Sequence, residues 1–186
     1  YVYLRGGEHN VLVPNEKGTG APEYIAYFRN VDGTSDTNRI HLKAFKGERP
    51  IIGKAAGIAQ GTGLVLMESS WWEIAGIEVA NTNNGGIWLA GGSELKVHHV
   101  TVHHAAHAFS GGNPAGIKVN GASNVDIGFS TFFETVEDMP FFFVRGNGIQ
   151  LFSNVGTVKI HNSRFTQTVD HEVYECPTSG TSCDPS

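Results

Sequence analysis

The histidines are the residues whose type and spacing first suggest chemistry. Five of them, His98, His99, His103, His104 and His107, fall within ten residues. Imidazole binds transition metals and acts as a general acid or base near neutral pH. Alternation of apolar residues makes His98 point outward from a strand and places His99 at a corner, while His103 and His107 share a face only if the chain is helical there. We therefore expect no single metal site from this cluster, and a catalytic role stays open for His104, His107 and His171.

The two cysteines lie close together near the end of the sequence. Cys176 and Cys183 are separated by six residues, in a segment rich in Pro, Gly, Ser and Thr with no third ligand nearby. This spacing argues against a metal or redox pair. We expect a local disulfide in an exported protein, with two free thiols in a loose tail as the alternative.

The composition excludes several classes of protein. Of 186 residues, 24 are Gly and 17% are charged, whereas 40% are hydrophobic. Gly is about twice and charge about two thirds of the usual share, which argues against helical bundles, and the apolar content argues against disorder. The net charge of −5 and the absence of a basic patch exclude nucleic acid as the expected partner. No apolar run reaches the roughly 18 residues of a membrane span.

A repeat organises most of the sequence. A phrase of Gly, aliphatic, any residue, aliphatic begins at Gly63, Gly86, Gly116 and Gly148, with a weaker copy at 172–174. A second phrase follows each of the first four copies, at 72–79, 95–102, 125–132 and 158–165. Its central aliphatic residues lie 10, 10, 10 and 11 residues after those of the first phrase; the pairs are Leu64 and Ile74, Ile87 and Val97, Ile117 and Ile127, and Ile149 and Ile160. This constancy indicates a solenoid of short coils.

Each coil is predicted to contain three short strands. Apolar residues alternate within each phrase, as in strands with one buried face, and two residues form a tight corner between the second and third strands. Variable loops follow at about 80–85, 103–115, 133–147 and 166–171. Strands this short are stable only when each coil covers the next. The sequence thus predicts an all-β fold of about five to six coils.

This coil pattern resembles the right-handed parallel β-helix of the pectate-lyase-like superfamily. VYLRGGEHN (2–10) and IHLKAFKGERPIIG (40–53) are similar to the opening coils of such proteins. The resemblance covers residues 1–175 and leaves 176–186 as a loop-like tail. The superfamily includes polysaccharide lyases, glycoside hydrolases, epimerases, adhesins and phage tailspikes, so the fold alone does not determine the function. It usually carries an N-terminal cap, none of which is visible here, and we expect part of the native protein to be absent from this sequence.

The resemblance implies a ligand groove over the outward side of the first strands. Alternation puts Val65, Trp88, Lys118, Gln150 and Tyr174 on that side, in a ladder with coils about 4.8 Å apart. The two longest predicted loops, 103–115 and 133–147, flank the ladder.

The resemblance to β-helix lyases further implies how these residues would act. A uronate lyase needs a base to remove the proton next to the carboxylate and a cation to neutralise that carboxylate. Lys118 would be the base and Arg145 the carboxylate clamp. The remaining roles are Ca²⁺ ligands at Glu134, Glu137 and Asp138, a further catalytic group at His107, and substrate contacts at Trp88, Gln150, Asn120, Asn113 and Tyr174. Hydrolysis ranks lower, because no Asp lies in the first-strand phrases to supply the usual pair of carboxylic acids.

Two functions of different classes remain open at this point. The first is a secreted or cell-surface enzyme, a polysaccharide lyase that acts on an acidic glycan. The second is a non-catalytic carbohydrate-binding, adhesive or structural β-helix module, which is monomeric or part of a larger chain or assembly. The supply of convergent acids is small, which favours the second, while the loops that flank the ladder favour the first.

Overall fold

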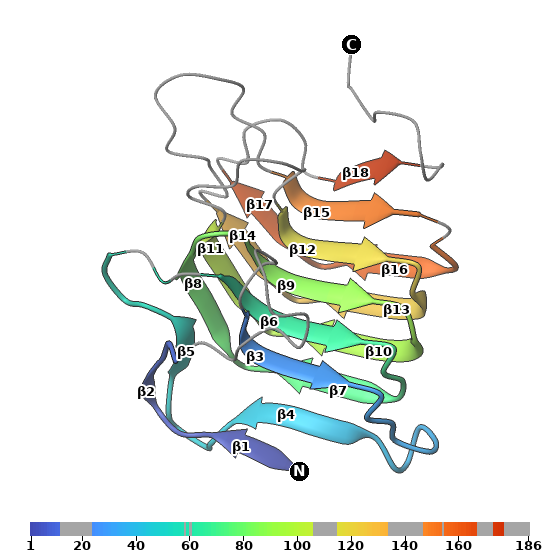
Figure 1. The fold of residues 1–186 in the computed structure, drawn as a ribbon, viewed down its shortest axis with the longest axis horizontal. Helices are drawn as coiled ribbons and strands as arrows, with labels where there is room; N and C mark the ends of the chain where they lie inside the picture. The colour runs from blue at the N-terminus through green and yellow to red at the C-terminus, as the bar shows by residue number, and fades with distance from the viewer. Residues whose placement is uncertain are drawn as a thin grey trace, which may run out of the picture.

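The structure is a computed structural model in which strands wind into a stack of parallel coils (Figure 1). It describes residues 1–11, 24–57, 59, 61–105, 115–133, 147–153 and 155–166, and the backbone of 173–176. The described residues contain strands, turns and bends, and none of them forms a helix long and apolar enough to cross a membrane.

Three parallel sheets of six strands each form the sides of the coil. Sheet I contains β3 (Tyr24–Arg29), β6 (Thr62–Met67), β9 (Gly85–Ala90), β12 (Ala115–Asn120), β15 (Asn147–Phe152) and β18 (Val173–Cys176). Sheet II contains β1 (Val2–Leu4), β4 (Ile40–Ala44), β7 (Trp72–Ala75), β10 (Ser93–His98), β13 (Ser123–Gly128) and β16 (Val158–His161). Sheet III contains β2 (Gly7–His9), β5 (Pro50–Gly53), β8 (Glu78–Thr82), β11 (Thr101–Ala105), β14 (Thr131–Phe133) and β17 (Arg164–Thr166). The predicted parallel β-helix with three strands per coil is therefore confirmed.

The register predicted from the repeat is also confirmed. In sheet I, Leu64 pairs with Ile87, Ile87 with Ile117, and Ile117 with Ile149. The central aliphatic residues of the second phrase form the corresponding column in sheet II, through Leu42, Ile74, Val97, Ile127 and Ile160. These columns point into the stack and, with the sheet III column of Ile52, Val79, Val102 and Phe132, make one hydrophobic core.

The corner between sheets II and III has the same backbone in each regular coil. Gly76, His99, Phe129 and Asn162 occupy it, with φ values of 68°, 53°, 51° and 49°. Gly and Asn adopt this left-handed region with little strain, but Phe and His do so less readily. The equivalent backbone at all four positions shows that the stack imposes the corner on whichever residue stands there.

The glycine that begins the first phrase has a packing reason. A Cβ atom on Gly63 would lie 2.5 Å from Val79 Cγ1 in sheet III and 2.7 Å from the carbonyl oxygen of Gly86. A Cβ on Gly86 would lie 2.5 Å from Val102 Cγ1. The phrase thus marks the place where sheet I approaches the inward valines of sheet III too closely for a side chain.

Two predicted loop boundaries are wrong. β11 extends through Ala105, so His103 and His104 lie in a strand and not in the variable loop assigned to 103–115. β8 extends through Thr82 and β9 begins at Gly85, which leaves only two residues between strands where 80–85 was expected. Both strands continue because their partners in the neighbouring coils continue, as the pairing of Ala105 with Thr82 shows. Pairing across coils overrides a boundary read from local alternation.

We predict that Gly63→Ala destabilises the protein by about 1–3 kcal/mol, the usual range for forcing an extra group into a packed core. The added methyl would collide with Val79 and with backbone, and backbone cannot move aside. Urea denaturation at neutral pH measures the change. Gly6→Ala is the matched control, because its Cβ would have 3.4 Å or more to every neighbour, and it should stay within about 0.5 kcal/mol of the wild type. Equal stabilities of the two variants would contradict the packing argument.

Candidate functional site

The outward column of sheet I is in the register that the sequence predicted. Val65 pairs with Trp88, Trp88 with Lys118, Lys118 with Gln150, and Gln150 with Tyr174. We call Trp88, Lys118 and Gln150 the sheet I ladder. Tyr174 continues it by backbone position.

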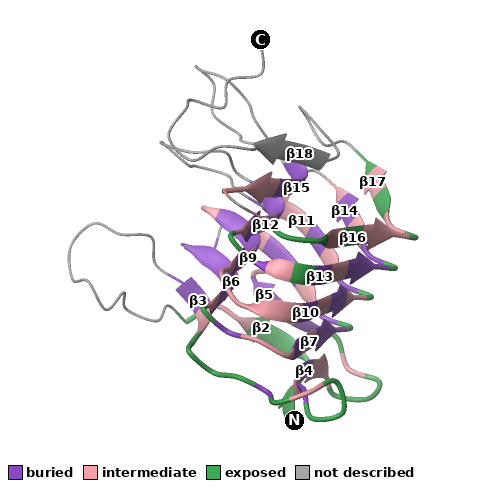
Figure 2. Cartoon of the chain, turned by 90° about the vertical axis from the view of Figure 1, so that its right-hand side faces the viewer, coloured by how far each residue is buried: buried purple, intermediate pink, exposed green. Residues whose placement is uncertain are grey.

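The ladder is more covered than an open groove would be. Val65 and Gln150 are 0% exposed although both lie on the outward side of their strands. Trp88 and Lys118 are half-buried. Figure 2 shows β6 and β9 largely in the colour of buried residues, whereas β16 of sheet II is intermediate and exposed. The outward face of sheet I is therefore closed to solvent at Val65 and Gln150 and only partly covered at Trp88 and Lys118.

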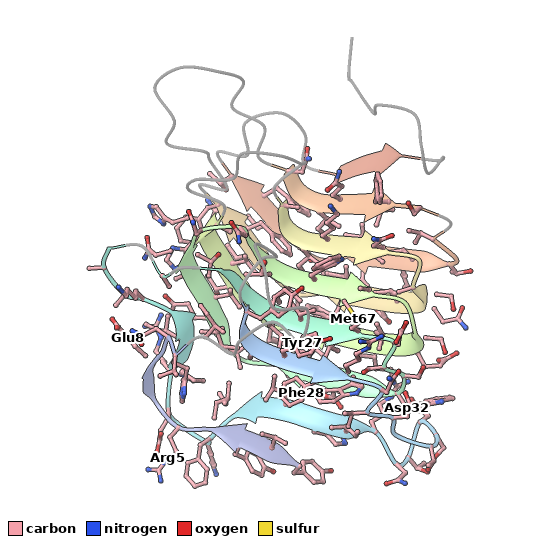
Figure 3. The ribbon with its side chains drawn as sticks, viewed as in Figure 1. Arg5, Glu8, Tyr27, Phe28, Asp32 and Met67 are labelled. Atoms are coloured by element: carbon pink, nitrogen blue, oxygen red, sulfur yellow. The ribbon has the colours of Figure 1, made fainter. Side chains whose placement is uncertain are left out.

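At the N-terminal end, the same face carries a different set of side chains. Tyr27 pairs with Val65, and its hydroxyl lies 3.5 Å from the sulfur of Met67 (Figure 3). The Tyr27 ring also stacks on Tyr24, with 4.9 Å between ring centres. Phe28, the next residue, packs inward against Trp72. Around Tyr27 this face is therefore aromatic and apolar, while Arg29 at the end of β3 pairs with Glu68.

Lys118 lies between two aromatic rings. Its Nζ is 5.9 Å from the ring centre of Trp88, in the preceding coil, and 5.2 Å from that of Phe152, in the following one. No hydrogen bond or ion pair joins Nζ to any other described residue. Burial lowers the pKa of Lys118, since desolvation disfavours its charged form. At a given pH, more of this lysine is a neutral amine than of a solvated one, as a general base requires.

The strands on either side of β12 carry buried polar atoms that have no hydrogen-bond partner among the described residues. Both side-chain atoms of Gln150, Nε1 of Trp88 and Oδ1 of Asn147 are buried and unpaired with any described residue. A buried unpaired polar group costs about 1–3 kcal/mol. Such groups are rare in folded proteins, and several of them on adjacent coils mark a place where a ligand or water would supply the partner. Asn120, two residues beyond Lys118, is half-buried and lies between Ala90 and Phe152.

Several predicted site residues lie outside what the structure describes. Among these are His107, Asn113, Glu134, Glu137, Asp138, Arg145 and Cys183. For Tyr174 and Cys176 the backbone alone is described, in β18. The stretches 106–114 and 134–146 directly precede β12 and β15, the strands that carry Lys118 and Gln150. The structure thus joins Trp88, Lys118, Gln150 and Asn120 on one face, and the roles of the other residues remain predictions.

The histidines form two separate pairs and not one metal site. His98 lies at the end of β10 in sheet II, at the position that His161 occupies two coils later, as expected. His98 Nδ1 is 2.8 Å from Nδ1 of His99, and His103 Nδ1 is 2.7 Å from Nδ1 of His104. Within the described ranges, no group of three or more His, Cys, Asp or Glu side chains could hold a metal ion.

Two glutamates that the sequence reading did not consider hold these histidines. Glu73 Oε1 accepts a hydrogen bond from His98 Nε2 at 2.8 Å, and Glu78 Oε1 accepts one from His103 Nε2 at 2.9 Å. Each acid precedes its histidine by 25 residues, close to the length of a coil. That equal spacing was visible in the sequence, but it has meaning only once neighbouring coils are known to stack in register.

Glu73 is the more strongly held of the two. Burial raises its pKa, but hydrogen bonds from Lys43 and His98 and the charges of Lys43 and His41 lower it more, to about 2. Lys43 Nζ lies 2.7 Å from Oε1. The carboxylate is therefore ionised throughout the physiological range, and it ties the coil of β4 to the coils of β7 and β10.

We predict a loss of stability in acid that depends on Glu73. Its pKa is lower in the folded state (about 2) than the ordinary 4.5, so its contribution is complete above about pH 4.5 and is lost as the pH falls toward 2. Glu73→Gln should cost about 1–3 kcal/mol at pH 7 and should narrow the difference in unfolding free energy between pH 7 and pH 3. Glu68→Gln, at an exposed ion pair with Arg29, should change stability by less than about 1 kcal/mol. An unchanged pH dependence in Glu73→Gln would contradict this assignment.

We also predict that Lys118→Met stabilises the protein. The pKa of Lys118 is lower when folded than when unfolded, so the unfolded chain binds more protons between the two values and stability rises with pH there. Below that window the charged form is buried at a cost, which methionine removes while keeping contact with both rings. We expect a gain of about 0.5–2 kcal/mol, or a melting temperature about 2–4 °C higher per kcal/mol. Lys159→Met, at an exposed position of β16, is the control and should be neutral; a destabilised Lys118→Met would contradict the burial cost.

The comparisons with known proteins agree with this geometry. The family model of the right-handed β-helix region matches residues 2–174, nearly the whole stack. Comparison with curated proteins and with solved structures finds no match to the chain. The chain belongs to the family of right-handed β-helix proteins.

Proposed function

We propose that this protein is a secreted or cell-surface polysaccharide lyase of the pectate-lyase-like type, which cleaves a uronate-containing glycan by β-elimination. The observation that carries the proposal is the position of Lys118, half-buried between Trp88 and Phe152 with no acidic partner among the described residues. Burial of a lysine in this way destabilises the folded protein, and a function of its amine would account for that cost. Proton abstraction next to a carboxylate is a use that suits a lysine of lowered pKa.

The elimination step that we propose begins at Lys118 of the ladder. The neutral amine of Lys118 takes the proton from the ring carbon that bears the carboxylate. The electrons of that C–H bond form a double bond to the neighbouring carbon, and the bond from that carbon to the glycosidic oxygen breaks. The departing oxygen takes a proton from solvent or from an acid, for which His107 is the candidate. The products are an unsaturated uronate and a new sugar end, and Lys118 then returns its proton to solvent.

The residues next to Lys118 suit substrate binding. The half-buried Trp88 ring offers a flat apolar face for a sugar ring, and its Nε1, which has no partner among the described residues, can donate to a hydroxyl. The amide of Gln150 can donate and accept at once, which matches vicinal hydroxyls or a carboxylate. Asn120 follows on the same face. Asn113 and Tyr174 complete the substrate contacts that we propose.

Neutralisation of the substrate carboxylate is the remaining requirement. We propose Arg145 as its clamp, and Ca²⁺ held by Glu134, Glu137 and Asp138 as a second source of positive charge. Carboxylate oxygens are the ligands that Ca²⁺ prefers. These four residues lie between β14 and β15, in the stretch that precedes the strand of Gln150. The chain order alone supports their place at this end of the ladder.

We predict that the protein generates ultraviolet-absorbing unsaturated uronate from pectate, alginate or a glycosaminoglycan. Lys118→Ala should lower kcat by about 100-fold or more, the usual contribution of a general base, and Lys159→Ala should leave the rate unchanged. Lys118→Arg should shift the alkaline rise of the pH–rate profile upward, since guanidinium loses its proton only at much higher pH. Removal of Ca²⁺ with a chelator tests whether Glu134, Glu137 and Asp138 act through a bound Ca²⁺.

Three results would separate the alternatives. Product formation that persists in Lys118→Ala would contradict the role of Lys118. Reducing-end release without ultraviolet absorbance would indicate hydrolysis. Binding of an acidic glycan on an array, lost in Trp88→Ala and without any turnover, would identify a carbohydrate-binding module in place of a lyase.

A further inference from the structure

Two histidine pairs on the outside of the stack share an uncommon geometry. In each pair the rings belong to consecutive residues, His98–His99 and His103–His104, and the second residue has a left-handed backbone, with φ of 53° and 46°. This backbone turns the second ring toward the first, and the two rings stand nearly perpendicular, at 83° and 79°. The facing Nδ1 atoms are 2.8 Å and 2.7 Å apart.

The hydrogen bonds of the first ring decide which lone pair is free for a ligand. The Glu73 carboxylate accepts from Nε2–H of His98, and the Glu78 carboxylate accepts from Nε2–H of His103. With its proton on Nε2, a neutral imidazole has its lone pair on Nδ1. The contact between the two Nδ1 atoms then contains one proton, carried by the second ring. A carboxylate behind a histidine in this way is the usual support for a metal-bound imidazole.

The distance between the two Nδ1 atoms indicates which coordination geometry a bound ion would have. Two nitrogens at right angles, each about 2.0 Å from a metal, are about 2.8 Å apart, whereas tetrahedral angles require about 3.3 Å. The observed separations fit adjacent equatorial positions of a tetragonal ion. We propose that the His98–His99 pair, and its repeat at His103–His104, each chelate one divalent ion of tetragonal preference, Cu²⁺ above all. On binding, the second ring loses its Nδ1 proton to solvent, and the two rings turn so that both Nδ1 lone pairs point at the ion instead of at each other; water fills the other positions.

A metal site with only two protein ligands is consistent with the position of these pairs on the outside of the stack. Each pair supplies two imidazoles, in keeping with the lack of any larger metal-ligating group in the described residues. His99 is exposed and His98 half-buried, so an ion reaches the pair directly from solvent. The ring of Phe129 stacks on the opposite side of His99, 5.3 Å away, and fixes its orientation. Such a site binds and releases its ion readily and is independent of the elimination proposed for sheet I.

The stack contains its own matched control. His161 occupies the sheet II position of His98 two coils later, and its Nε2 lies 2.7 Å from Oδ1 of Asp126, as His98 lies against Glu73. The corner residue after it is Asn162, with φ of 49°, and its Oδ1 is 3.0 Å from Nδ1 of His161. The carboxylate, the histidine and the left-handed corner residue are therefore all present at this position, and only the second imidazole is missing.

The test exchanges the two corner residues in the full chain without an affinity tag. Calorimetric titration with Cu²⁺ gives the number of sites, and electron paramagnetic resonance shows whether two nitrogens bind the ion. We expect His99→Asn to lose one equivalent, His104→Asn to lose the other, and Asn162→His to gain one. His161→Phe, which removes a histidine that is not in a pair, should leave the number of sites unchanged.

The choice of substitutions also controls for misfolding of the variants. His99→Asn places at this corner the residue that Asn162 already provides at the equivalent one, and circular dichroism would confirm the fold. Asn162→His is expected to add a Cu²⁺ site. An unfolded protein would not reproduce the spectrum of an ion bound by two nitrogens. An unchanged number of Cu²⁺ sites in His99→Asn, or no added site in Asn162→His, would overturn the proposal.

Discussion

The in-register stacking of coils is the constraint on which the rest of this structure depends. Every strand of the regular coils has its hydrogen-bonding partners in the coils before and after, and strands of three to six residues would not persist otherwise. Register fixes the inward columns, since a slip of one residue would turn each aliphatic side chain outward. The close approach at Gly63 and Gly86 follows from the same register, because each glycine meets a valine at a fixed height in sheet III.

Register has a second effect, which is to place equivalent outward residues directly above one another. Like charges would then repel at about 4.8 Å. Sheet II avoids this by alternation, in the column of His41, Glu73, Lys96, Asp126 and Lys159. The acids of this column are also the residues that hold His98 and His161, so one arrangement both balances charge and orients the histidines of later coils.

The sequence was sufficient for those parts of the structure that repeat. The constant spacing from Leu64 to Ile74 and its later copies predicted the columns, and alternation predicted that Trp88, Lys118 and Gln150 share a face. The sequence did not predict how exposed each outward side chain is. Gln150 was expected to line an open groove and is fully buried, because alternation gives the side of the strand and not its exposure to solvent. The contacts of Glu73 and Glu78 were missed because histidines were weighed against their neighbours in the chain, while their true partners stand one coil away.

The three outward faces differ in how fully their polar groups are satisfied, and this difference bears on function. On sheets II and III, His98, His103 and His161 each have a carboxylate partner. On sheet I, Lys118 has no hydrogen bond or ion pair to a described residue, and buried atoms of Gln150 and Trp88 have no partner among the described residues either. Among the described residues, the buried polar atoms without a partner thus lie mainly on sheet I, where burial makes the missing hydrogen bonds costly. A ligand with hydroxyls and a carboxylate would supply those hydrogen bonds, and its binding energy would offset the cost of burying these polar groups.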